Sequence, residues 1–298
     1  QVKNRNFDRI ANHTFWYSED VLLKLSFLEQ QIQELTSNKD FFNLVLAETV
    51  RETSFTRNGE FKRFRMKEES IKKFKPDVFR MFELKVKRNL EGLKKFNEVS
   101  ANTTARIFDF NTTYGIPSKA IKKGAVDMVV TSPPYGDSRT TVAYGQFSRW
   151  ANEWFGFENA SNLDSILMGG QKANEEIFKT ESIRETLDKI KALDEKRYFE
   201  VVSFLNDYWL SMKNVAESIR NGGVACYVVG NRTVKGIQID LDYYTAEMFE
   251  KCGFKHINTI VRCIPNKRMP SKTSPTNIAG NKVSTMTHEY IVIMKKEL

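Results

Sequence analysis

The fold prediction for this sequence depends most on the stretch VDMVVTSPPYGDSRT, residues 126–140. Its first five residues are apolar except for one aspartate, and two adjacent prolines and a tyrosine come shortly after them. A short apolar run that ends at turn-forming residues is typical of a strand buried on both faces in a parallel sheet. We therefore expect a strand over residues 126–130 that leads directly into a proline-containing loop.

On both sides of this strand, the C-terminal region alternates between strand and helix patterns. Short apolar runs predict strands, and longer runs with helical spacing predict helices. The expected strands cover residues 106–110, 224–229, 257–264 and 288–295, and the expected helices cover residues 183–220, which end at Asn-Gly-Gly, and 243–251. Such alternation predicts an α/β fold, a partial doubly wound sheet of the Rossmann-like kind, with its last two strands forming an antiparallel hairpin at the edge.

The N-terminal hundred residues have a different pattern. Apolar residues recur at helical spacing between residues 15 and 50, so we expect residues 1–100 to form a mostly helical region ahead of a second domain over residues 101–298. Residues 51–95 are rich in lysine and arginine with phenylalanines between them. Two interpretations stay open: a surface that contacts a phosphate backbone, or a helical face whose long basic side chains cover an ordinary core.

Composition narrows the class of protein. The 298 residues carry 46 Lys and Arg against 37 Asp and Glu, a net charge of +9, which favours a polyanionic partner but is equally compatible with a solvated basic surface. No membrane span or signal peptide is recognisable, and three widely spaced cysteines fit a reduced, cytoplasmic protein. The cysteines and histidines lack the spacing of a disulfide framework or a metal site. They are Cys226, Cys252, Cys263, His13, His256 and His288.

The proline loop predicts the chemistry of a ligand. In an open α/β sheet, ligands bind beyond the carboxyl ends of the strands, which is where Ser132, Pro133, Pro134 and Tyr135 fall. Prolines have no N–H donor and a fixed φ, so their loop offers rigidly placed carbonyl acceptors. Acceptors suit an amino group, and a tyrosine can lie against a flat ring. A nucleobase extruded from a duplex, with its exocyclic amine held, satisfies both requirements.

In this loop the sequence resembles the amino-methylating DNA methyltransferases, which carry a Pro-Pro-aromatic motif in this position. The form Thr-Ser-Pro-Pro-Tyr, residues 131–135, is similar to the cytosine-N4 branch, whereas adenine-N6 enzymes more often have aspartate in place of the serine. The resemblance implies double-stranded DNA as substrate, S-adenosyl-L-methionine as methyl donor and a restriction–modification role in a bacterial or archaeal cytoplasm. An adenine-N6 enzyme and a non-catalytic DNA-recognition subunit remain alternatives.

The resemblance continues through residues 222–231 and from residue 262 to 290, where the late loop of such enzymes faces the substrate and the final strand closes the sheet. It implies three groups of functional residues. The catalytic group is Ser132, Pro133, Pro134 and Tyr135; the cofactor contacts are Asp109, Thr131 and Ser132; the DNA and substrate contacts are Arg139, Gly230, Asn231, Arg268, Lys272, Ser274 and Asn277. The basic region and residues 136–172 and 266–282 are further candidates for reading the DNA sequence.

One part of the family's pattern is missing. Members hold the donor on a glycine-rich loop that comes after a strand, and upstream of Asp109 this sequence has only Gly59 and Gly92, both in helical-looking surroundings. In such a fold, strand 126–130 would expose an apolar, unpaired edge unless a partner covered it. Residues 12–17 also resemble the segment that these enzymes have just after their cofactor half. We therefore expect a divided enzyme, a heterodimer whose cofactor half lies on a second polypeptide, or else one half of an enzyme that has been cut by proteolysis.

Overall fold

The computed structural model describes residues 6–59, 62–100, 102–137, 143–264, 272–273, 283–284 and 288–297. The chain forms two compact units. One unit comprises Gln1–Arg106 and Ala143–Asp164, and the other comprises Ile107–Val142 and Ser165–Leu298. The helical unit thus takes in residues 143–164, which the predicted boundary near residue 100 leaves in the second domain.

The first unit is helical, as its apolar spacing predicted. Its core packs Trp150 and Trp154 against Tyr17 and the apolar faces of the longer helices. Asn38 precedes α3 in the left-handed region, at φ 59°, and so breaks the chain between two helices. The elements are η1 (Asn6–Arg9), α1 (His13–Trp16), α2 (Glu19–Glu34), α3 (Lys39–Glu52), α4 (Glu68–Lys73), α5 (Val78–Ser100) and α6 (Tyr144–Trp154), with α7 (Leu163–Ile166) at the boundary of the units.

Several basic residues of the segment 51–95 have partners inside this unit. The Arg51 guanidinium lies 4.0 Å from the centroid of the Phe147 ring, and Lys85 Nζ lies 2.8 Å from a carboxylate oxygen of Glu52. Lysine and arginine stems commonly cover apolar surface in this way. For these residues the structure favours an ordinary helical face. DNA contact by the remainder of the segment stays a prediction.

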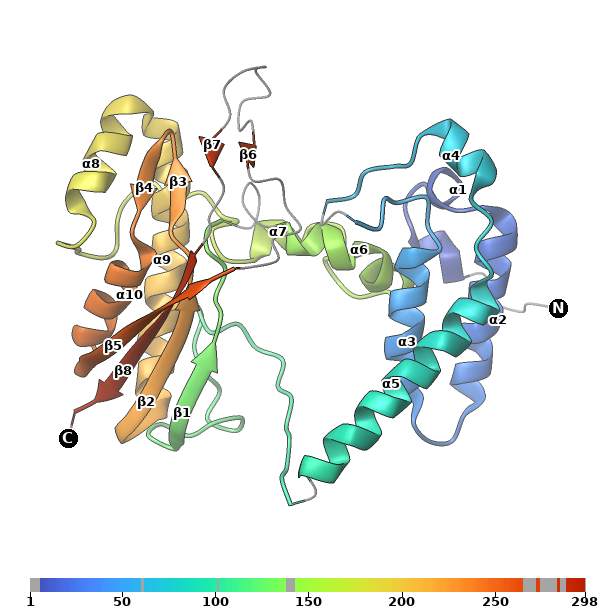
Figure 1. The fold of residues 1–298 in the computed structure, drawn as a ribbon, viewed down its shortest axis with the longest axis horizontal. Coiled ribbons are helices and arrows are strands. Elements are labelled where there is room, and N and C mark those ends of the chain that lie inside the picture. The colour runs from blue at the N-terminus through green and yellow to red at the C-terminus, as the bar shows by residue number, and fades with distance from the viewer. Residues whose placement is uncertain are drawn as a thin grey trace. The chain divides into compact units, whose positions relative to one another are not determined.

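The second unit is built on a mixed four-stranded sheet in the order β1-β2-β8-β5 (Figure 1). Strand β1 (Val126–Thr131) runs parallel to β2 (Ile219–Val229), while β8 (His288–Lys296) is antiparallel to both β2 and β5 (Phe254–Cys263). Two small ladders accompany it: β3 (Arg232–Val234) with β4 (Ile237–Ile239), and β6 (Lys272–Thr273) with β7 (Val283–Ser284). The predicted α/β class with a C-terminal antiparallel hairpin is confirmed.

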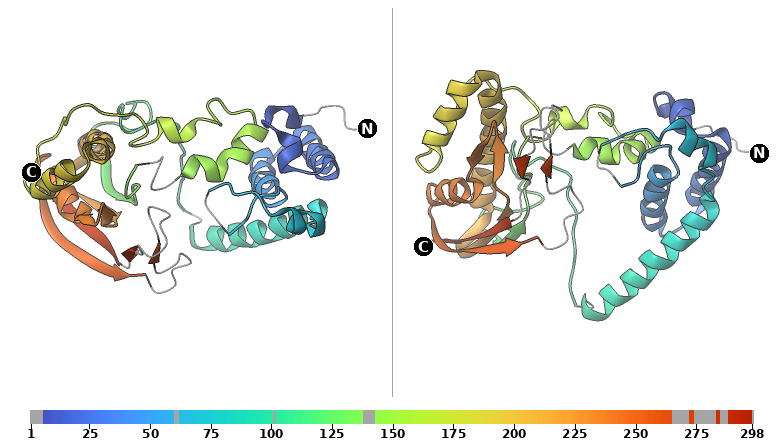
Figure 2. Two further views of the ribbon diagram at one scale, coloured as in Figure 1. Left: turned by 90° about the horizontal axis from the view of Figure 1, so that it is seen from above. Right: turned by 45° about the horizontal axis from the view of Figure 1, so that its top comes forward.

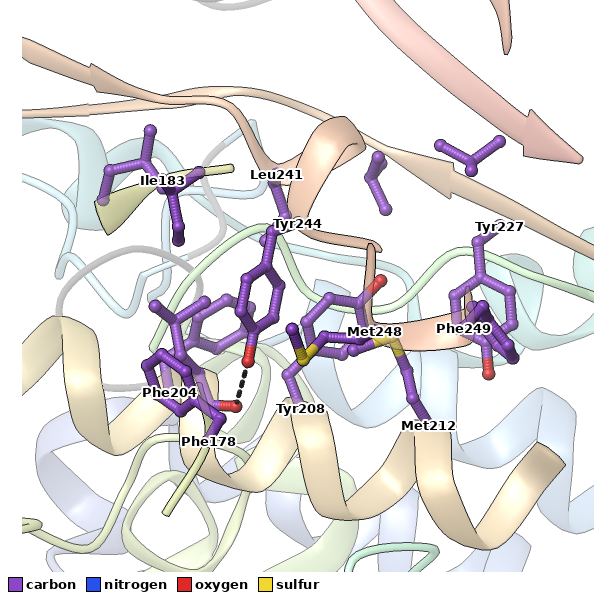
Figure 3. Close-up of a cluster of buried hydrophobic side chains, with 14 of the residues drawn as sticks. Phe178, Ile183, Phe204, Tyr208, Met212, Tyr227, Leu241, Tyr244, Met248 and Phe249 are labelled. Carbon is purple, nitrogen blue, oxygen red and sulfur yellow. Dashed lines mark hydrogen bonds between the residues drawn. The ribbon is translucent and has the colours of Figure 1, made fainter. Parts of the chain in front are cut away.

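Helices α8 (Arg184–Leu193), α9 (Glu195–Ser218) and α10 (Leu241–Glu250) complete this unit, and α9 and α10 lie on the same face of the sheet (Figures 1 and 2). Between them and the sheet lies an aromatic core in which Tyr208, Tyr227 and Tyr244 are buried (Figure 3). None of the helices in the described part of the chain is long and apolar enough to span a membrane.

The opposite face of the sheet carries apolar side chains from all four strands. Paired residues share a face, and the register runs from Val130 to Cys226 to Ile293 across β1, β2 and β8. Met128 is 57% exposed and Val130 68% exposed. We call this set the open face; it comprises Met128, Val130, Val224, Cys226, Val228, Ile260, Ile291 and Ile293.

The expectation that strand 126–130 is buried on both faces is therefore wrong within this chain. Among the described strands β1 pairs only with β2, so its other edge is unpaired, and no described helix of this unit lies over the open face. The apolar pattern itself was read correctly, because both faces of β1 do carry apolar residues. Within the described part of the unit, a second covering layer is missing.

Two other element predictions are wrong. Residues 106–110 form no strand, and Ile107 is 98% exposed, because no neighbouring described strand offers these residues a ladder. The predicted helix over residues 183–220 is two helices, separated at Asp194, whose extended backbone starts α9 and whose side chain accepts a hydrogen bond from the Arg197 N–H. The Asn-Gly-Gly run at residues 221–223 lies inside β2 and ends no helix.

Candidate functional site

The carboxyl ends of β1 and β2 meet at one edge of the sheet because the two strands are parallel. The register pairs Thr131 with Tyr227, so the loop that begins at Ser132 leaves the sheet at the same edge as Gly230. Strand β8 runs the other way and starts at this edge, and its second residue, Glu289, pairs with Arg262 of β5. Segments distant in sequence are thus brought together beside the proline loop.

Side chains at this edge form a continuous hydrogen-bonded series that comprises Ser132, Tyr135, Glu289 and Arg262. The Ser132 Oγ lies 3.1 Å from the Tyr135 hydroxyl, which donates to Glu289 Oε1 at 2.9 Å. The other oxygen of Glu289 accepts from Arg262, whose Nε is 3.1 Å away and whose Nη2 also donates. Ser132 is exposed, Tyr135 is half-buried, and the Glu289 side chain is 13% exposed.

The surroundings of Tyr135 keep its hydroxyl protonated at neutral pH. Burial raises its pKa above the ordinary value of 10.0, and the Glu289 carboxylate raises it further, while hydrogen bonding from Ser132 and the charge of Arg262 act in the opposite direction. A neutral phenol that donates to a carboxylate has its ring held in one orientation. The Tyr135 ring is therefore held in a fixed orientation at the sheet edge, where a planar ligand can stack on it.

The loop after β1 contains the two adjacent prolines. Pro133 and Pro134 lie in irregular chain, neither helix nor strand, and neither carbonyl accepts a hydrogen bond from the described residues. Their oxygens are therefore available to a ligand's donor groups, next to the exposed Ser132 hydroxyl. This arrangement suits a planar ligand that carries an amino group.

A buried support lies behind the proline loop. The carboxylate of Asp137, two residues after Tyr135, is buried and lies 3.4 Å from the Arg232 guanidinium. Gly169, at φ 71°, packs so closely here that an added Cβ would lie 2.9 Å from the Asp137 Cβ. Its N–H donates to Asp207, a carboxyl whose pKa is raised by burial. These contacts fix the position of the loop from the side away from solvent.

The structure describes some of the predicted site residues and not others. Asp109 is exposed in irregular chain, Thr131 ends β1, and Gly230 is buried directly after β2. The side-chain oxygen of Asn231 accepts a hydrogen bond from the Leu241 N–H at 2.8 Å, so this residue stabilises the start of α10. Lys272 begins β6. Arg139, Arg268, Ser274 and Asn277 lie outside the described residues.

Four residues of the site had no role assigned from sequence: Glu289, Arg262, Asp137 and Arg232. Each of them lies near a residue that the sequence analysis selected as functional, but the pairs they form depend on strand register.

No described cluster of histidine, cysteine, aspartate or glutamate could hold a metal ion. The three cysteines form no disulfide.

Fold and geometry together define an α/β protein with a candidate ligand site at the carboxyl edge of its parallel strands. The chain is 36% identical over 308 residues to the Type II methyltransferase M.MvaI of Kocuria varians, a match that covers 97% of this chain and 67% of that protein. The chain belongs to the Type II methyltransferase family. No family model matches.

More distant similarity is found to solved structures of TTHA0409, a putative DNA modification methylase of Thermus thermophilus. One superposes with a TM-score of 0.33 at 15% identity, covering 65% of this chain and 55% of that one. The complex of the same protein with S-adenosyl-L-methionine gives a TM-score of 0.30 at 16% identity, covering 63% and 54%. This chain thus spans about half the length of the solved chains.

Proposed function

We propose that this chain is the target-base part of a DNA methyltransferase that methylates the exocyclic N4 of a flipped cytosine. The observation that carries the proposal is the proline loop at the carboxyl edge of the sheet, with the Ser132 hydroxyl exposed and the Tyr135 ring fixed by Glu289. The leading serine supports cytosine over adenine. Membership of the Type II methyltransferase family supports DNA as the substrate.

The residues of the loop act by positioning. Cytosine N4 is a weak nucleophile because its lone pair is delocalised into the ring. The Ser132 hydroxyl and the Pro133 carbonyl accept the two amino hydrogens, which localises that lone pair, while Tyr135 stacks on the base. Because the acceptors are already in place, little reorganisation is needed when positive charge develops on the nitrogen. Proximity alone contributes about 7–11 kcal/mol in well-oriented reactions.

The methyl donor is S-adenosyl-L-methionine, which supplies an electrophilic methyl group. The described residues do not complete a site for it: Asp109 is exposed, and β1 has no described neighbour on its far side. We propose that a second polypeptide carries the glycine-rich donor site, pairs with the edge of β1 and covers the open face. An uncovered apolar sheet face and an unpaired parallel edge both support this, since parallel sheets are normally covered on both faces.

The reaction is tested by incubating the chain, alone and with a complementing polypeptide, with DNA and tritiated donor. The complement is the part of the Kocuria varians relative that has no counterpart in this chain. We expect incorporation that Tyr135→Ala abolishes and that the exposed Tyr114→Ala leaves unchanged. Chromatography of the digested nucleosides then identifies the product.

Each result of this assay has a definite meaning. N4-methylcytosine supports the proposal, whereas N6-methyladenine establishes the adenine-N6 alternative. DNA binding without any incorporation, in the presence of the complement, would establish a non-catalytic recognition subunit. Full activity of the chain alone would overturn the requirement for a second polypeptide.

A further inference from the structure

Resting on the proposed function, we propose that Glu289 is the terminus of a proton path that runs from the target amine through Ser132 and Tyr135, with Arg262 holding the carboxylate in place. Glu289 does not touch the base in this proposal. It is a positioning and proton-accepting residue that acts through Tyr135. Its contribution is separate from the carbonyl acceptors of the proline loop.

The proton path accounts for the positive charge that methyl transfer leaves on the amine. When the new N–C bond forms, the amine nitrogen becomes positively charged and must lose one proton. That proton passes to Ser132 Oγ as the serine proton passes to the Tyr135 oxygen and the tyrosine proton passes to Glu289 Oε1. The products are a neutral methylated amine, a neutral serine, a neutral tyrosine and a protonated carboxyl. No further reactant is needed.

The geometry favours this direction. The Ser132 and Tyr135 oxygens are 3.1 Å apart, and the Tyr135 oxygen is 2.9 Å from Glu289 Oε1, so hydrogen bonds connect the hydroxyl that faces the base to the carboxylate. Exposure decreases along the path, from the exposed Ser132 to a Glu289 side chain that is 13% exposed. A group facing the base thus connects to a mostly buried carboxylate within the hydrogen-bond reach that proton transfer needs.

Arg262 and Tyr208 are charged or ionisable groups near the path. Arg262 of β5 pairs with Glu289, whereas burial raises the pKa of Tyr208 on α9 and the charge of Tyr135 raises it slightly further. Arg262 is 59% exposed, so as a simple surface ion pair with Glu289 it would contribute little to stability. Its function in the proposal is to fix one carboxylate oxygen, which leaves the other directed at Tyr135.

The hydrogen-bonded series is tested first without catalysis. The chain is labelled with ¹³C at the ζ carbon of tyrosine, and the Tyr135 signal is assigned as the one missing from Tyr135→Phe. Glu289→Gln removes a cause that raises the pKa of Tyr135, so its titration should shift to lower pH. Arg262→Gln removes a cause that lowers it, so the titration should shift to higher pH. Shifts of the same sign, or none, would show that the contacts are absent.

The proton path itself is tested by single-turnover methyl transfer with the complementing polypeptide. Glu289→Gln keeps the size of the side chain but cannot take a proton, and Tyr135→Phe keeps the stacking ring but loses the hydroxyl. Each should slow transfer by about 10²-fold, within the usual range for proton transfer, with DNA affinity unchanged. The double variant should be no slower than either single one, because both break the same path.

Glu185→Gln is the matched control, since Glu185 forms an exposed pair with Lys189 within α8 and should leave the rate unchanged. Independent, multiplicative losses in the double variant, or wild-type rates in Glu289→Gln, would overturn the proton path. Absence of transfer by the wild-type chain would overturn the proposed function and the path with it. The tyrosine titrations would still report whether the series of contacts exists, so the two failures are distinguishable.

Discussion

At the scale of single residues, Gly169 is the position where backbone conformation and the candidate site meet. Its φ of 71° lies in the left-handed region, and an added Cβ would lie 3.0 Å from the Asp137 Cα as well as close to its Cβ. Gly169→Ala should lower the free energy of unfolding by about 1–3 kcal/mol, since it combines backbone strain with overpacking. It should also reduce methyl transfer, because Asp137 supports the proline loop. Urea titration and the tritium assay measure the two effects.

Substitutions at two other glycines separate the cost of backbone strain from the cost of overpacking. Gly236 has a similar φ of 82° but open space around it, so Gly236→Ala should cost only the strain of a left-handed backbone, about 1–2 kcal/mol. Gly92 lies inside α5 with nothing near it, and Gly92→Ala should stabilise by about 0.5–1 kcal/mol. Equal costs at Gly169 and Gly236 would mean that the contact with Asp137 contributes nothing.

At the scale of elements, apolar patterning predicted the parts of the sheet well. Strands β1, β5 and β8 lie close to their predicted residues, because each carries an apolar run bounded by turn residues, whereas β2 begins at Ile219, ahead of the Asn-Gly-Gly run that was predicted to precede it. The wrong predictions concern segments whose conformation depends on contacts with other elements. Residues 106–110 have a strand's composition but no described neighbour to pair with, and Asp194 ends one helix by capping the next.

The hairpin of β3 and β4 was missed for a local reason. Its two turn residues, Lys235 and Gly236, both have positive φ, and a lysine there does not predict such a turn. The site shows the same division. The proline loop was found because its residues are contiguous, whereas Glu289 and Arg262 meet through the β5–β8 register, which a sequence pattern does not specify.

Helix α10 is attached to the segment before α8 through Glu247, which makes this contact sensitive to acid. The Glu247 carboxylate accepts hydrogen bonds from the Thr180 hydroxyl at 2.6 Å and from the backbone and side chain of Ser182. Burial alone would raise the pKa of Glu247, but these bonds, with Lys251 and the Glu181 N–H, outweigh it and lower the pKa to about 2 from the ordinary 4.5.

A carboxyl with a lowered folded-state pKa stabilises the fold above its ordinary pKa, and this stabilisation is lost as the pH falls toward the folded-state value. Between about pH 5 and pH 2 the wild-type chain should therefore lose on the order of 1–2 kcal/mol that Glu247→Gln does not lose. Urea unfolding across this range measures the difference. Glu250→Gln, an exposed position on the same helix, should keep the wild-type acid dependence, and a flattened curve there would remove the assignment to Glu247.

At the scale of the whole molecule, the net charge of +9 becomes a testable statement about DNA. Arg268 and Lys272 are predicted to face the DNA, so changing both to glutamine should weaken binding and reduce the slope of log affinity against log salt by about two. Lys123 and Lys189, exposed lysines that pair with Glu217 and Glu185, are the matched control pair and should leave the slope unchanged. An unchanged slope for the Arg268 and Lys272 double variant would exclude these residues from the phosphate contacts.

The open face leads to the last prediction, which concerns completeness of the enzyme. Val130 is 68% exposed in this chain, so Val130→Lys should leave its unfolding midpoint unchanged, yet the same lysine would be buried without a partner once a covering polypeptide docks. Activation by the complementing polypeptide should therefore fall at least about tenfold, a loss of about 1.4 kcal/mol. Val129→Lys, on the face packed against the helices, should instead destabilise the chain itself.

Sedimentation tests which molecule covers the open face. If the chain self-associates, Val130→Lys abolishes the self-association and the complementing polypeptide has no effect, then a second copy of the chain covers this face in place of a donor-binding partner.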